Sequence, residues 1–234
     1  MADSYDLILK GGTVVNQDGE GLRDIGIAAG KITALGHLGR ASAGEVIDCA
    51  GLHVLPGVID TQVHFREPGL THKEDLETGS RSAVMGGVTA VFEMPNTNPT
   101  TTSSAALADK IASARHRMHC DFAFFIGGTR ENTNELPDLE RLPGCAGVKV
   151  FIGSSTGALL VEDDDTLRRV LGVIRRRASF HSEDEFRLRE RQGLRVAGDP
   201  RTHPVWRDEL VALTSTKRLI RIARETGNRC RPPI

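Results

Sequence analysis

The residues best suited to chemistry follow a short apolar run at positions 54–59, which has the composition of a buried strand. If the strand continues, its alternation places Gln62, His64 and Arg66 on one side. An imidazole binds metal ions, and a guanidinium binds a carboxylate through two parallel hydrogen bonds. The stretch therefore predicts a metal site next to a site for an anionic substrate. Taken alone, it also fits a strand that ends in an ordinary polar loop.

Other polar residues stand in, or just beyond, the C-terminal ends of other predicted strands, namely Asn96, Lys149 and His181. Lys149 lies inside an apolar strand, where an ammonium group is unfavourable unless it is neutralised, paired or able to reach solvent. In a barrel of parallel strands the C-terminal strand ends meet at one face. We therefore expect these residues and His64 to form one cluster.

The order of the predicted elements gives the fold class. Residues 1–55 contain short strands and turns, which indicates a small β unit, and residues 56–234 alternate strands with amphipathic helices. The predicted strands of the second part are 88–93, 121–126, 147–151 and 178–180, and its predicted helices are 75–85, 103–118, 164–177 and 205–225. This alternation predicts a parallel sheet, either open and doubly wound or closed as a (β/α)8 barrel. The polar strand ends favour the barrel.

Composition excludes several partners. The chain has 30 basic and 31 acidic residues, so neither a nucleic-acid nor a membrane partner is expected. No apolar run reaches membrane-spanning length, and the acidic N-terminal residues do not resemble a secretory signal. The 4 cysteines are far apart and form no Cys-x-x-Cys pair, which favours reduced thiols and a cytoplasmic location.

Four motifs together resemble one family. They are Leu-Pro-Gly-Val-Ile-Asp-Thr-Gln-Val-His-Phe-Arg-Glu-Pro-Gly at 55–69, Met-Pro-Asn-Thr at 94–97, the strand around Lys149, and His-Ser-Glu-Asp at 181–184. In this combination and order they resemble dihydroorotases, in the cyclic amidohydrolase branch of the metal-dependent amidohydrolases. The resemblance implies a (β/α)8 TIM-type barrel, incomplete here with about five to six strands. It also implies that residues 1–55 belong to a small β-sandwich.

The resemblance assigns roles to the polar residues. It implies that His64, Lys149 and His181 bind one or two Zn²⁺ ions, with Lys149 carbamylated by carbon dioxide so that it can bridge them. It implies that Arg66 and Asn96 bind the carboxylate of the substrate. Glu183 and Asp184 are interpreted separately, as acids that complement the N-terminus of the next helix.

The chain departs from the family pattern in two places. Gln62 stands where the family has the first histidine of His-x-His. The next zinc-binding histidine, and the aspartate that moves the proton, are expected beyond residue 234, so no catalytic acid or base is assigned within the chain. The two prolines in the last five residues do not suit a central strand, and our hypothesis is a truncated or frame-shifted product.

The implied function is the zinc-dependent interconversion of dihydroorotate and N-carbamoyl-aspartate in pyrimidine biosynthesis. Two alternatives stay open. Hydantoinases and allantoinases share the implied fold and metal site but need no carboxylate clamp. Some dihydroorotase-like proteins are catalytically inactive structural partners of a transcarbamoylase, which the residue at Gln62 also fits. The expected partners are thus a small-molecule substrate and either a second copy of the chain or a transcarbamoylase.

Overall fold

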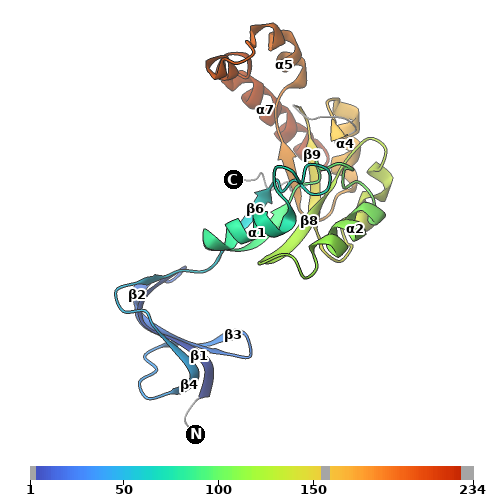
Figure 1. Cartoon of the computed structure of the whole chain (residues 1–234). Helices are drawn as coiled ribbons and strands as arrows, with labels where there is room; N and C mark the ends of the chain where they lie inside the picture. Colours follow the sequence, from blue (N-terminus) through green and yellow to red (C-terminus); the bar gives the residue numbers. More distant parts are fainter. Residues whose placement is uncertain (1–3, 154–158, 228–234) are drawn as a thin grey trace. The chain divides into compact units, whose positions relative to one another are not determined.

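The computed structural model describes residues 4–153 and 159–227, which form two compact units, residues 1–58 and 59–234 (Figure 1). In the described part of the chain, no helix is long and apolar enough to cross a membrane. The first unit is a five-stranded sheet, and the second is an α/β unit built on five further strands. The predicted α/β class and the preceding β unit are confirmed.

The sheet of the first unit has the order β3-β2-β1-β4, with β5 also paired to β1. Its strands are β1 (Ser4–Asn16), β2 (Gly19–Ala28), β3 (Lys31–Gly36), β4 (Ser42–Asp48) and β5 (His53–Val54). β1 to β3 are antiparallel, whereas β4 and β5 run parallel to β1. The large apolar side chains exposed on these strands are Leu22, Ile32, Leu35, Val46 and Ile47. Much apolar surface therefore remains outside the core of this unit.

The diglycine at Gly11 and Gly12 does not end β1. The strand continues past it through a register shift between Leu9 and Gly12. Gly11 has φ +73°, and its N–H donates to Asp24 Oδ1 at 2.8 Å. Asp24 Oδ2 also accepts from Leu38 N at 2.9 Å, and these two bonds hold the pKa of Asp24 below its usual range. Asp24 thus supplies the acceptor that the bulged backbone needs.

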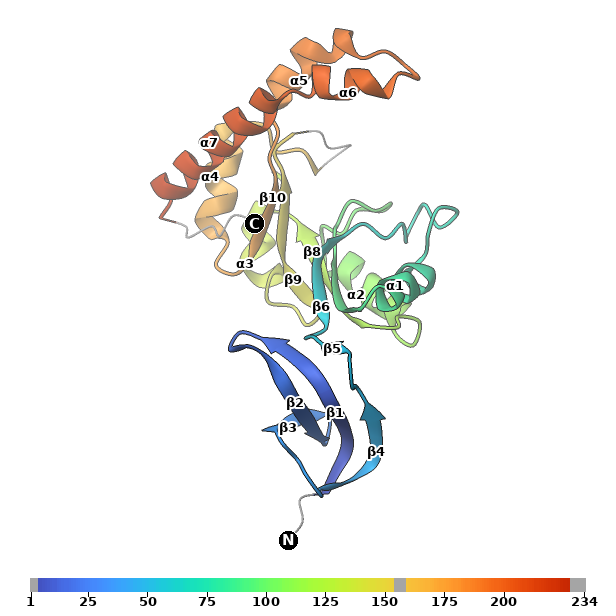
Figure 2. The same cartoon turned by 90° about the vertical axis from the view of Figure 1, so that its left-hand side faces the viewer.

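The second unit is built on a curled sheet with the order β10-β9-β8-β7-β6, whose paired strands β7 to β10 are parallel (Figure 2). Its strands are β6 (Val58–Val63), β7 (Val88–Glu93), β8 (Asp121–Gly127), β9 (Cys145–Phe151) and β10 (Ala178–His181). The α-helices are α1 (Leu76–Met85), α2 (Ser104–Ala114), α3 (Leu136–Leu139), α4 (Asp164–Val173), α5 (Glu185–Arg191), α6 (His203–Trp206) and α7 (Glu209–Glu225). Short 3-10 turns are η1 (Thr133–Glu135), η3 (Gln192–Leu194) and η4 (Pro200–Thr202). The strands are joined in the barrel-type βα order that the sequence predicted.

The core of this unit lies between the sheet and its helices. Phe124, Ile126, Val148 and Val150 are fully buried on the central strands, and helix residues such as Leu167 pack against them. Figure 1 shows α2 and α4 beside β8 and β9. These apolar side chains fix the central strands, whose C-terminal ends carry the predicted site.

Three predicted helices are shorter in the structure. The predicted helix 103–118 ends at Ala114, and the predicted helix 205–225 is divided, because Arg207 is not helical and Asp208 caps a new helix. The helix predicted over 164–177 ends at Val173, where the buried carboxylate of Glu140 accepts the next backbone N–H groups. A side chain distant in sequence thus replaces the helical hydrogen bonds, and periodicity does not reveal it.

The buried strand predicted at 54–59 is wrong. β6 begins only at Val58, and Val58 and Ile59 are 54% and 58% exposed. β6 is the last strand in the order of its sheet, so it has one neighbouring strand within the described residues. An apolar run records the residue types of a strand but not how many neighbours cover it.

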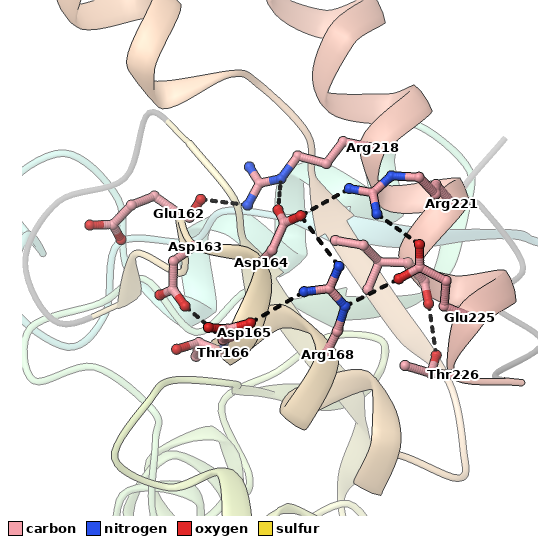
Figure 3. A network of polar contacts seen from close by, with 11 residues as sticks. Glu162, Asp163, Asp164, Asp165, Thr166, Arg168, Arg218, Arg221, Glu225 and Thr226 are labelled. Carbon is pink, nitrogen blue, oxygen red and sulfur yellow. Dashed lines mark hydrogen bonds and ion pairs between the residues drawn. The ribbon is translucent and has the colours of Figure 1, made fainter.

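A network of charged side chains fastens α7 to α4 (Figure 3). Arg218 and Arg221 of α7 donate to the two carboxylate oxygens of Asp164, which begins α4. Arg168 and Arg221 also share Glu225. With the buried side chains of α7, this network holds α7 against α4.

Candidate functional site

His64 stands immediately after β6 and is half-buried. Its Nδ1–H donates to Asn96 Oδ1 at 2.8 Å, since an amide oxygen only accepts. The proton is therefore assigned to Nδ1, which leaves the lone pair of Nε2 available to a ligand. Burial lowers the pKa of His64, the bond to Asn96 opposes this, and the charges of Lys149, Arg66 and His181 lower it further. Lys149, Arg66 and His181 are thus near enough to His64 for their charges to act on its imidazole.

Asn96 lies three residues beyond β7, and its Oδ1 accepts from His64 and so orients the imidazole ring. The sequence predicted that Asn96 and Arg66 together bind a substrate carboxylate, and that role stays a prediction. Arg66 forms no ion pair with any residue in the described ranges, and its guanidinium therefore has no carboxylate partner there. Gln62, which stands where the family pattern has the first histidine, lies near the end of β6 and is exposed.

Lys149 lies inside β9 and is 1% exposed. The alternative interpretation, in which the charged end of Lys149 reaches solvent, is therefore wrong. Nζ lies 5.1 Å from the centre of the Phe151 ring, and no carboxylate in residues 4–153 and 159–227 pairs with it. Burial lowers the pKa of Lys149 to about 8. A minor fraction of the amine is therefore neutral at pH 7, and this neutral form is a nucleophile.

His181 is the last residue of β10, paired in register with Phe151 of β9, and its ring stacks on the Phe151 ring at 5.9 Å between centroids. Its Nε2 and Glu183 Oε2 are 2.5 Å apart. Glu183 also accepts two bonds from Arg207. Burial raises the pKa of Glu183, but the bonds from His181 and Arg207 outweigh it and lower the pKa to about 2. The carboxylate is thus ionised and orients His181.

The interpretation of the acids at 183 and 184 is confirmed only in part. Asp184 caps α5, and its side chain accepts from Arg187 N at 3.0 Å. Glu183 instead pairs with His181 and Arg207 as described above. No local pattern indicates the pairing with Arg207, because Arg207 lies 24 residues further along the chain.

The residues fit a metal ion under one condition. Among the described residues, no group of three His, Cys, Asp or Glu side chains could hold a metal ion. His64 and His181 supply two imidazoles, but an ammonium at Lys149 repels a cation. Reaction with carbon dioxide would convert the amine into a carbamate, which offers carboxylate-like oxygens. The unpaired, buried Lys149 fits that conversion, whereas the unmodified side chain does not fit a ligand role.

A separate pocket of about 530 Å³ lies among residues 195–207 and is lined by Trp206, His203 and Arg195, among others. None of the residues predicted for the metal or the substrate lines it. Arg207 borders this pocket and also donates to Glu183, which pairs with His181. The residues predicted for the metal and the substrate therefore lie outside this pocket.

A family model and two curated relatives all place similar proteins among the amidohydrolases and related cyclic-amide hydrolases. The model of the Amidohydrolase family matches residues 53–194. An allantoinase of Deinococcus radiodurans is 33% identical over 232 residues, which cover 96% of this chain and 52% of that protein. A dihydroorotase of Methanosarcina mazei is 40% identical over 166 residues, covering 69% of this chain and 36% of that protein.

Solved structures give the same picture. The L-hydantoinase (dihydropyrimidinase) of Arthrobacter aurescens superposes with a TM-score of 0.86 at 27% identity, covering 97% of this chain and 52% of that one. A D-hydantoinase superposes with a TM-score of 0.80 at 28% identity, covering 96% of this chain and 50% of that one. These matches cover nearly all of this chain but only about half the length of the allantoinase and of the L-hydantoinase.

Proposed function

Because this chain belongs to the amidohydrolase family, we propose that it supplies His64, Lys149 and His181 as metal ligands to the active site of a hydrolase that opens cyclic amides. Lys149 is the observation that supports this most strongly. It is buried among the strand ends without a carboxylate partner in the described ranges, and its pKa is lowered to about 8. A lysine kept only for packing gains nothing from such a position.

In the proposed reaction the neutral Lys149 amine forms a bond to the carbon of carbon dioxide and releases a proton to solvent. The product is an anionic carbamate, and we propose that it shares the metal with His64 and His181. A divalent cation such as Zn²⁺, when bound, supplies Lewis acidity to the amide carbonyl and to the attacking water. Asn96 and Glu183 fix the rings of the two histidines, each through one ring nitrogen.

The substrate that the site supports best carries a carboxylate, and we assign it as dihydroorotate. Arg66 stands two residues from His64 and forms no ion pair with another described residue. A guanidinium is suited to a planar carboxylate because it donates two parallel hydrogen bonds. The reaction would be the interconversion of dihydroorotate and N-carbamoyl-aspartate.

A neutral cyclic amide is the second candidate. Asn96 Oδ1 already accepts from His64, so only the amino group of Asn96 is free to bind a substrate. The amino group is the part that could donate to a carboxylate, so the bond to His64 does not decide between the two substrate classes. The relatives include allantoinases as well as a dihydroorotase, which fits either substrate class.

The metal centre can be tested on the chain as it is. We expect carbon-13-labelled bicarbonate to give a carbamate resonance, and Zn²⁺ binding to become tighter when bicarbonate is present. Both effects should be absent in Lys149→Arg and present in Lys217→Arg, which changes an exposed lysine of α7. A wild-type chain that gives no carbamate signal and binds no zinc would contradict the proposed metal centre and favour a structural role.

The substrate class can be tested with Arg66→Met, measured by calorimetry on the metal-loaded protein. Loss of a charge-assisted carboxylate contact should weaken dihydroorotate binding about 10- to 100-fold and leave allantoin binding unchanged. Arg81→Met, on the surface of α1, is the matched control. If Arg66→Met weakens allantoin and spares dihydroorotate, the assignment of the substrate is wrong.

A further inference from the structure

The loop that follows β6 carries two of the proposed site residues, His64 and Arg66, but its own hydrogen bonds are few. Within the loop, Leu70 N donates to Arg66 O at 2.8 Å. A loop that must hold a metal ligand and a substrate-binding arginine needs a firmer support, because small displacements of such groups weaken binding. Glu67, the residue after Arg66, provides it.

The carboxylate of Glu67 receives three hydrogen bonds from two other elements. Arg117, just beyond α2, donates Nη1 to Oε1 at 2.7 Å and Nη2 to Oε2 at 2.9 Å. Leu76 N, at the start of α1, donates to Oε2 at 3.0 Å. The bonds from Arg117 outweigh partial burial and lower the pKa of Glu67. The carboxylate is thus ionised and joins the loop to both helices.

The same loop is closely joined to the loop after β7. Asn98 N donates to Pro68 O at 3.1 Å. Gly69 has φ +104°, and a Cβ there would lie 2.6 Å from the backbone oxygen of Asn98, so only glycine fits this approach. Two residues earlier in that second loop, Asn96 accepts from His64. The two loops therefore touch at three points and should move as one body.

We propose that Glu67 and Arg117 are positioning residues for the active site. Their ion pair fixes the loop of His64 and Arg66 against α1 and α2, and the contacts of Asn98 pass that constraint on to Asn96. The inference deepens the proposed function and rests on it for the roles of the positioned residues. An ordinary half-exposed ion pair contributes little to global stability, so the effect should be local.

Hydrogen exchange followed by mass spectrometry tests the coupling directly. In Arg117→Met, amides in residues 64–76 and also 94–99 should exchange about ten-fold faster. The variant lacks the bonds from Arg117 to Glu67, so local opening of the loops costs less free energy. Arg117→Lys, which keeps one donor to Glu67, should recover part of the protection. Glu67→Gln, which keeps the shape of the side chain, should reproduce the Arg117→Met pattern.

Arg187→Met is the matched control, because Arg187 makes a similar two-point contact with Asp208, away from both loops. It should change exchange near α5 and the start of α7 and leave residues 64–76 and 94–99 unchanged. The inference is overturned if Arg117→Met affects neither loop, if only residues 64–76 respond, or if Arg187→Met produces the same pattern.

Binding of Co²⁺, followed by its visible absorption, separates this inference from the proposed function. Loss of an outer support typically weakens metal binding about 10-fold or more, so Arg117→Met should bind Co²⁺ more weakly than wild type and Arg187→Met should not. If the wild-type chain binds no Co²⁺ with bicarbonate present, the proposed metal centre fails. The exchange pattern still decides whether Glu67 and Arg117 couple the two loops.

Discussion

Lys110 and Lys149 are both buried, yet their surroundings differ completely. Lys110, in α2, donates to Glu93 at the end of β7 and to Met94 O at 3.2 Å. Lys149 contacts the ring of Phe151 and pairs with no carboxylate among the described residues. Burial lowers the pKa of both lysines, but only at Lys110 does a neighbouring carboxylate oppose it. A buried lysine with a carboxylate holds structure together, and one without a carboxylate remains available for chemistry.

The largest expected effect comes from removing the paired lysine. In Lys110→Met the Glu93 carboxylate loses its partner, and its Oε1 already has no hydrogen bond. We expect the free energy of unfolding to fall by about 3 kcal/mol near neutral pH. Urea unfolding measures it, with Lys217→Met as the exposed control. An unchanged stability would mean that the ion pair does not hold α2 to the sheet.

The pH dependence of that loss sharpens the test. Burial raises the pKa of Glu93 from 4.5 to about 7, against the effect of Lys110. A raised carboxyl pKa means that the folded state binds more protons than the unfolded state, so stability falls as pH rises from 4.5 through the folded pKa. Without Lys110 the loss should therefore be smaller at about pH 5 than at about pH 8. Equal losses at both values would show that Glu93 does not take up the proton.

The smaller effect has the opposite sign. Lys149→Met removes an unpaired buried ammonium. In buffer free of carbon dioxide at neutral pH, we expect the free energy of unfolding of this variant to exceed that of wild type by about 1 kcal/mol. The pKa of Lys149 falls from 10.5 to about 8 on folding, so the unfolded state binds more protons between those values. Wild-type stability should rise with pH across that window, and the advantage of the variant should shrink. A destabilised variant would mean that Lys149 has a partner that stabilises its charge.

Much of the fold could be predicted because the strand and helix periods repeat along the chain. The places of His64, Lys149 and His181 at or near the ends of three strands follow from the order of the elements. What could not be predicted is which charges meet. Lys110 reads as one polar position on an apolar helix face, and its partner Glu93 lies 17 residues away. Arg117 and Glu67 are 50 residues apart, and no local pattern connects them.

The position of β6 at the edge of its sheet also could not be predicted from the sequence. An apolar stretch such as Val58 and Ile59 reads as buried because its residue types favour a core, but its exposure depends on how many strands lie beside it. Gln62 poses the related difficulty, since residue type alone does not say whether an amide replaces a ligand or only ends a strand. The exposure of Val58 and Ile59 and the role of Gln62 both depend on which residues lie beside them in space and not on their own residue types.

The close approach of Gly69 to Asn98 limits how such sequences can diverge. A lineage can exchange many surface residues of either loop, but a side chain at Gly69 requires the backbone at Asn98 to move. Any relative with a larger residue there should have compensated in the second loop by insertion, deletion or a changed turn. The two loops are therefore expected to be inherited, and altered, as a pair.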